Sequence, residues 1–142
     1  MGGGELGVSD YPLAERRPEL IEGRRGKRLD EITLDALVAG EIEMEDLRIT
    51  PTALRQQAEV ARAAGRPMLA ENFERASELV DVPQDFIMQA YELLRPGRAK
   101  DKEPLLEAAQ RMREKYGAER MARFLEEAAE VYERRGLFTY RF

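Results

Sequence analysis

The feature that most constrains the fold is a repeated helical period separated by proline and glycine. From Leu29 onward, apolar residues recur at three- and four-residue spacing. Thr33 and Thr50 are placed to cap helices, and Pro51 and Pro67 suit first helical positions. The sequence contains no alternating pattern typical of strands and no repeat of the solenoid type. It therefore predicts an all-α fold.

We expect a small helical domain of about five to six helices over residues 29–142, preceded by an extended N-terminal arm over residues 1–28. The expected helices cover about residues 34–39, 50–64, 67–80, 83–94, 101–116 and 118–135. Small alanine side chains in the second of these allow a neighbouring helix to approach closely. The large side chains expected in the core are Ile32, Leu54, Phe73, Ile87, Leu105, Met112 and Phe124.

The amino-acid composition excludes most of the common catalytic mechanisms. The chain of 142 residues contains no His and no Cys, which excludes Ser-His and Cys-His catalysis, thiolate nucleophiles and imidazole ligands to zinc or cobalt. The 28 acidic and 23 basic residues give a formal net charge of -5, which argues against a nucleic-acid partner. No stretch is long and apolar enough to cross a membrane, and we expect a cytoplasmic protein.

The N-terminal arm has no sustained helical period. Residues 1–10 are rich in glycine, and Gly2 is the one feature shared with a myristoylation signal. Residues 11–28 contain two prolines and two glycines, so we interpret them as extended rather than helical. Apolar residues on such an arm dock either on the same chain or on a partner. The apolar arm residues are Tyr11, Pro12, Leu13, Leu20 and Ile21.

A basic cluster closes the arm. Its members are Arg24, Arg25, Lys27 and Arg28, with Arg17 upstream. The spacing is too short for a nucleotide-binding loop, and no hydroxyl stands where magnesium would need one. The remaining alternatives are a solvated loop and a loop that faces an acidic partner.

Acidic residues gather at residues 41–46 and 126–130. Neither group has the spacing of a calcium loop, and a di-iron site would need the missing His. No lysine lies in an apolar setting that would lower its pKa toward Schiff-base chemistry. We therefore expect no catalytic residue, no metal site and no cofactor bound by this chain.

An ordered set of motifs carries a resemblance to a known family. The chain resembles the small subunit of the adenosylcobalamin-dependent diol and glycerol dehydratases, closely over about residues 11–98 and more loosely to about Gly136. It departs from the family at residues 98–104 and in its aromatic end, residues 137–142. The motifs are YPLAERRPELI (11–21), GKRLDEITL (26–34), DLRITP (46–51), LRQQAE (54–59), AGR (64–66), NFERASEL (72–79) and YELLRP (91–96).

The resemblance implies a structural role. In that family the large subunit holds the substrate and the radical chemistry, the medium subunit helps to hold the cobalamin, and the small subunit supplies no catalytic side chain. The complex is a dimer of such heterotrimers, located in the cytoplasm or in the lumen of a bacterial microcompartment. The arm and the basic cluster would then dock on the large subunit.

The alternative from another class is a free-standing helical adaptor or regulatory protein with a different partner. The aromatic residues at the end of the chain bear on this choice, because such a tail packs either on its own core or on a partner.

Overall fold

Two compact units make up the chain, with the boundary between Val80 and Asp81. The computed structural model describes residues 5–138, so Gly2, Tyr140 and Phe142 lie outside the described residues. The arm expected over residues 1–28 belongs to the first unit. None of the helices over residues 5–138 has the length and apolar character needed to cross a membrane.

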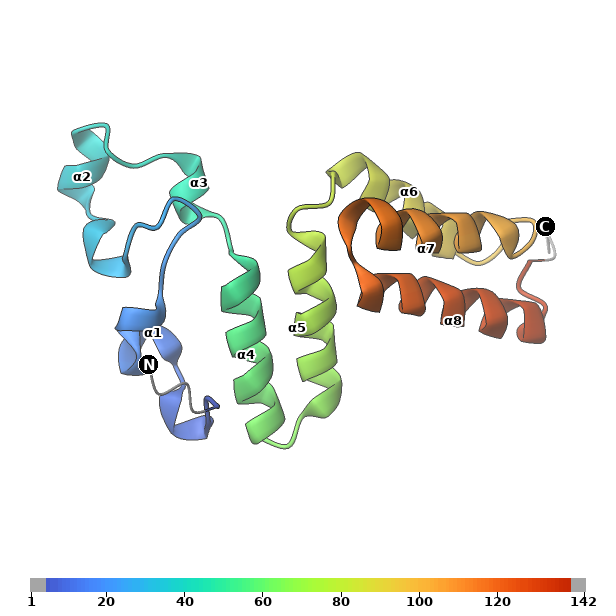
Figure 1. Ribbon diagram of the computed structural model, residues 1–142, viewed down its shortest axis with the longest axis horizontal. Helices are drawn as coiled ribbons and strands as arrows, with labels where there is room; N and C mark the ends of the chain where they lie inside the picture. Colours follow the sequence, from blue (N-terminus) through green and yellow to red (C-terminus); the bar gives the residue numbers. More distant parts are fainter. Residues whose placement is uncertain (1–4, 139–142) are drawn as a thin grey trace. The chain divides into compact units, whose positions relative to one another are not determined.

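Helices α4 (Pro51–Ala63) and α5 (Pro67–Leu79) run side by side in the first unit (Figure 1). The hydroxyl of Thr50 accepts a hydrogen bond from the amide of Ala53 at 3.0 Å, so the predicted N-cap is formed. The two helices approach closely because their contact is made of small residues. Ala58, Ala61 and Ala70 form a buried cluster, with Leu69 and Phe73 packed against it.

The N-terminal segment folds into short helical turns that pack on α4. It contains 3-10 turns at Val8–Asp10 and Pro18–Leu20 and a single α-helical turn, α1 (Leu13–Arg16). The expectation of an extended arm without helix is therefore wrong in this detail. Pro18 supports the second 3-10 turn, since the fixed φ of proline suits the first residue of a helical turn. The turns are also stabilised by the packing of Leu6 and Leu13 on Val60 of α4, a contact between residues far apart in the sequence.

Two further short helices, α2 (Leu34–Val38) and α3 (Met44–Leu47), connect this segment to α4. Thr33 caps α2 as predicted, because its hydroxyl accepts a hydrogen bond from the amide of Ala36. A 3-10 turn, Leu29–Glu31, precedes α2. Helix α3 was not predicted from the sequence, because a single turn is too short to show a helical period.

The second unit consists of α6 (Gln84–Leu94), α7 (Glu103–Tyr116) and α8 (Glu119–Arg135). Helices α7 and α8 lie side by side (Figure 1), and Gly117 joins them in the left-handed conformation that glycine adopts without strain. The hydroxyl of Tyr132 donates a hydrogen bond to the carbonyl of Leu94, which ties α8 to α6.

The all-α prediction is confirmed. All six expected helices are present among residues 5–138, and no strand forms there. An isolated antiparallel bridge joins Glu22 and Arg28.

The core prediction is confirmed in part. Leu105 and Met112 are fully buried, whereas Ile32, Leu54, Phe73 and Ile87 are half-buried. Phe124 was placed wrongly, because it is 38% exposed and its neighbour Leu125 takes the buried position.

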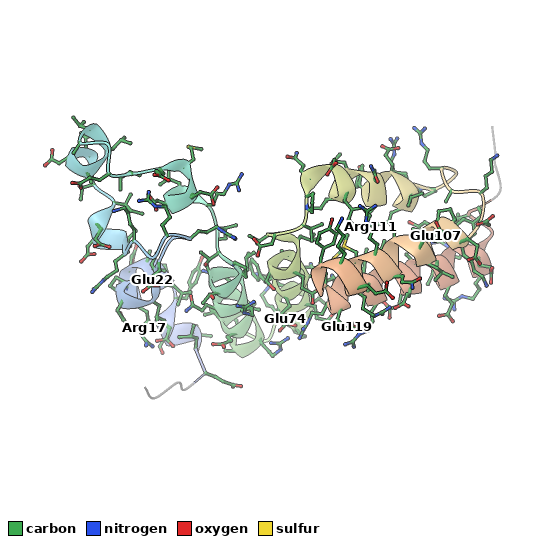
Figure 2. All side chains as sticks on the ribbon, turned by 45° about the horizontal axis from the view of Figure 1, so that its top comes forward. Arg17, Glu22, Glu74, Glu107, Arg111 and Glu119 are labelled. Carbon is green, nitrogen blue, oxygen red and sulfur yellow. The ribbon has the colours of Figure 1, made fainter. Side chains whose placement is uncertain are left out.

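Arg113 links α7 to α8 through two carboxylates. Its guanidinium lies 2.7 Å from Glu119 and 2.6 Å from Glu126. The hydrogen bond to Glu119, and to a smaller extent the one to Glu126, raises the pKa of Arg113. The hydrogen bond from Arg113 in turn lowers the pKa of Glu119. In Figure 2, Glu119 stands at the start of α8 while Glu107 and Arg111 lie on α7.

Candidate functional site

The candidate interface begins with a tight turn that presents the basic cluster. The amide of Gly23 donates to the carbonyl of Lys27 at 2.9 Å, and the amide of Gly26 donates to the carbonyl of Gly23 at 3.0 Å. The φ of Gly26 is 81°, a value that a glycine adopts readily. This turn holds Arg24 and Arg25 close to α3.

The basic cluster is paired with acidic residues of its own chain. Arg25 lies 3.0 Å from Asp46 and 3.3 Å from Glu43. Arg24 lies 3.8 Å from Glu45. The loop thus faces carboxylates of its own chain at and beside α3, an arrangement that differs from both alternatives left open by the sequence, a solvated loop and a loop facing an acidic partner.

Asp46 is the buried member of this contact. Its side chain is fully buried, and its Oδ2 accepts hydrogen bonds from the guanidinium of Arg25 and from the amide of Glu43. A buried carboxylate is costly unless it is paired and hydrogen-bonded. The sequence indicated only that Asp46 belongs to the acidic group at residues 41–46, because nothing local distinguishes a buried aspartate from an exposed one.

The apolar residues of the N-terminal segment divide into two groups. Leu13 is 3% exposed and packs with Leu6 and Val60, and Leu20 and Ile21 pack against the same cluster. These three candidates therefore contact their own chain. The other two, Tyr11 and Pro12, are exposed.

Arg17 fixes the turns of this segment to one another. Its guanidinium lies 3.0 Å from Asp10 and 2.6 Å from Glu19, and Figure 2 shows it together with Glu22 on the N-terminal segment. The hydrogen bond from the amide of Gly7, and after it the one from Arg17, lowers the pKa of Asp10. The hydrogen bond from Arg17 lowers the pKa of Glu19. Because Arg17 binds both carboxylates more strongly when they are ionised, these contacts stabilise the folded chain at neutral pH. The stabilisation is lost as the pH falls through the lowered pKa values and the carboxylates become protonated.

The remaining two candidates lie toward α2. Arg28 is exposed and lies 3.8 Å from Asp30. Lys27 lines a cleft of about 460 Å³ together with four carboxylates, those of Asp30, Glu31, Asp35 and Glu41. The structure thus gathers the candidates into one region of the first unit but directs several of them inward. No group of three or more ligating side chains that could hold a metal ion occurs among residues 5–138.

Comparison with known proteins identifies the family. The family model described as "Dehydratase small subunit" matches residues 6–139. The chain belongs to the dehydratase small-subunit family. Two relatives, each named propanediol dehydratase small subunit, come from Salmonella typhimurium and Citrobacter freundii. They are 46% and 45% identical to this chain over 125 residues, which cover 88% of this chain and 72% of each relative.

The match of the dehydratase small-subunit family extends across both units, since residues 6–139 include helices α1 to α8. The resemblance stated from the motifs is therefore confirmed over a longer stretch than the motifs themselves cover. The family model therefore covers the N-terminal segment as well as the helices.

One variant tests whether the basic cluster serves the chain's own fold. We expect Arg25→Ala to lower the free energy of unfolding by about 1 kcal/mol, because it removes the cation that the buried Asp46 carboxylate binds. Arg28→Ala is the matched control, and we expect a change within about 0.5 kcal/mol because Arg28 is more exposed. Urea unfolding followed by circular dichroism measures both. Equal losses in the two variants would contradict the assignment.

Proposed function

We propose that this chain is the small, structural subunit of an adenosylcobalamin-dependent dehydratase that converts a vicinal diol, propanediol or glycerol, into an aldehyde and water. The observation that carries the proposal is the identity of 46% over 88% of the chain to a propanediol dehydratase small subunit. The radical chemistry would take place on another subunit, and the isolated chain would be inactive. The absence of His and Cys from the sequence supports that division of labour.

The proposed partners are the large and medium subunits of the same enzyme, assembled as a dimer of heterotrimers. The N-terminal segment would contribute to the interface through three of its exposed members, Tyr11, Pro12 and Arg28. Leu13 and Arg25 would instead hold that segment in shape, Leu13 through the apolar cluster and Arg25 through its contact with Asp46. We propose a cytoplasmic complex, with the lumen of a bacterial microcompartment as the alternative location.

The residues of this chain do not fit the cofactor. This chain has no histidine, so it has no imidazole that could serve as an axial ligand to the cobalt. The cleft beside α2 is lined by Asp30, Glu31, Asp35 and Glu41, whose negative charges suit a cation rather than a corrin ring. We therefore assign cobalamin binding to the other subunits and derive no step of the reaction on this chain.

Co-expression with and without this chain tests the proposal. The tagged large and medium dehydratase subunits would be purified with and without the small subunit, and two quantities measured. These are the stoichiometry of the purified complex and the adenosylcobalamin-dependent formation of aldehyde. We expect one-to-one retention of this chain and loss of activity or of soluble complex when it is omitted. Full activity of the other two subunits alone, with this chain purifying separately, would overturn the proposal.

A further inference from the structure

The segment over residues 29–49 leaves an unusual number of large apolar side chains in contact with water. More than half of the large exposed hydrophobic residues in the described part of the chain fall within these twenty-one positions. We call them the apolar surface of segment 29–49. Its members are Leu29, Leu34, Leu37, Val38, Met44, Leu47 and Ile49.

In both short helices of this segment, the apolar face points outward. Leu34, Leu37 and Val38 occupy the spacing i, i+3 and i+4 on α2, so they share one face, and Leu34 and Val38 are 74% and 81% exposed. On α3, Met44 and Leu47 are exposed while Asp46 is buried. A helix on the surface of a monomer shows the opposite arrangement.

This arrangement is costly for an isolated chain. Helices of four and five residues are far too short to be stable by themselves and depend on packing of their apolar side. Helix α2 also stands apart from the α4–α5 pair in Figure 1, so that pair does not cover it. A clustered apolar surface of this kind marks a site of protein association.

The charges around this surface restrict what can cover it. Residues 29–49 contain seven carboxylates and one basic residue, Arg48. Three of the seven carboxylates are paired with Arg24 or Arg25. The other four line the cleft of about 460 Å³ beside α2, which remains acidic because Lys27 and Arg28 supply only two compensating charges. A second copy of this chain would bring two acidic surfaces together, and like charges across an interface are unfavourable. A partner with Lys or Arg at the edge of an apolar patch is complementary.

We propose that the apolar surface of segment 29–49 is the docking surface for a neighbouring subunit of the dehydratase complex. That subunit would cover α2 with apolar side chains and place a Lys or Arg in the acidic cleft lined by Asp35 and Glu41. This inference rests on the proposed function. It extends the proposed interface to a segment outside the N-terminal arm and the basic cluster.

A pair of variants tests the apolar part of the surface in the full chain. Leu34→Gln combined with Val38→Gln replaces the two most exposed apolar side chains of α2 by polar ones, and glutamine is as good a helix former as leucine and a better one than valine. Met68→Gln on α5 is the matched control, since Met68 is 70% exposed and lies outside the segment. Each chain would be co-expressed with the tagged large and medium subunits. We expect at least a tenfold loss of retention for the double variant and a change within twofold for the control.

A charge reversal tests the acidic part. We expect Asp35→Lys to reduce retention, with Glu107→Lys on α7 as a control that leaves it unchanged, and retention of the parent chain to weaken at high salt. Circular dichroism of the free chains checks that every variant keeps its helix content. A photo-crosslinking residue at position 38 adds a direct readout, since it should link to the large or medium subunit.

The outcomes separate the two proposals. Retention of the parent chain together with normal retention of the double variant would overturn the docking surface and leave the proposed function standing. Failure of the parent chain to be retained at all would overturn both. A parent chain that sediments as a dimer, with a monomeric double variant, would identify a second copy as the occupant and overturn the assignment to another subunit.

Discussion

We expect Leu125→Ala to lower the free energy of unfolding of the second unit by about 2–5 kcal/mol. Leu125 has no exposed surface, and it is one of three large side chains that are fully buried among the described residues, with Leu105 and Met112. The other buried positions of α7 and α8 are alanines, among them Ala109 and Ala122. Alanine has no side-chain rotamers, so these neighbours cannot turn to fill the cavity that the variant leaves.

The adjacent residue provides the control for this prediction. Phe124→Ala removes a larger side chain, but Phe124 is 38% exposed, and we expect it to cost at most about half as much as Leu125→Ala. Urea unfolding of the full chain, followed by circular dichroism, gives both values if the slopes against urea are unchanged. A larger loss for Phe124→Ala would show that α8 presents a different face to α7.

We expect Gly23→Ala to destabilise the first unit by about 2–3 kcal/mol, near the upper end of what overpacking costs. A Cβ atom at Gly23 would lie 2.7 Å from the carbonyl oxygen of Asp46 and 3.2 Å from its Cα. Both atoms belong to the backbone, so no side chain can swing away to relieve the clash. The basic turn or α3 must shift, which weakens the contact between Arg25 and Asp46.

Gly7→Ala is the matched control, because nothing lies within 4 Å of a Cβ there and its φ of -121° suits any residue. Its effect should be neutral or slightly stabilising, since alanine reduces the freedom of the unfolded chain. Thermal unfolding followed by circular dichroism compares the two variants. Equal stability would contradict the close crossing of the turn over α3.

The Gly23 prediction also bears on assembly. If segment 29–49 docks on another subunit, the turn that holds α3 in place positions part of that surface without touching the partner. Gly23→Ala should then weaken retention in the complex less than the double substitution on α2 does. The order of the two effects distinguishes a supporting contact from a direct one.

The sequence by itself determined where the six expected helices begin and end, to within two residues, and which family the chain belongs to. Caps such as Thr50, and stops such as Gly117, act through hydrogen bonds and backbone angles within a few residues. The family follows from the order and spacing of motifs, which are properties of the sequence alone. Both kinds of information are therefore present before any long-range contact forms.

Only the tertiary structure decided which faces are covered. The helical period defines an apolar side about 100° wide, but it does not say whether Phe124 or Leu125 stands at its centre. Ala122, Leu125 and Ala129 share one face of α8, and the small alanines let α7 approach there. Phe124 lies about 100° around the helix from Leu125, outside that face.

The same reason applies to the candidate interface. Arg25 and Asp46 are 21 residues apart, and neither residue type signals the pairing that buries one of them. The spacing of Leu34, Leu37 and Val38 predicts an apolar face on α2, and only the packing of the chain leaves that face in contact with water. Contacts between residues distant in the sequence depend on how the elements pack, so no local pattern can specify them.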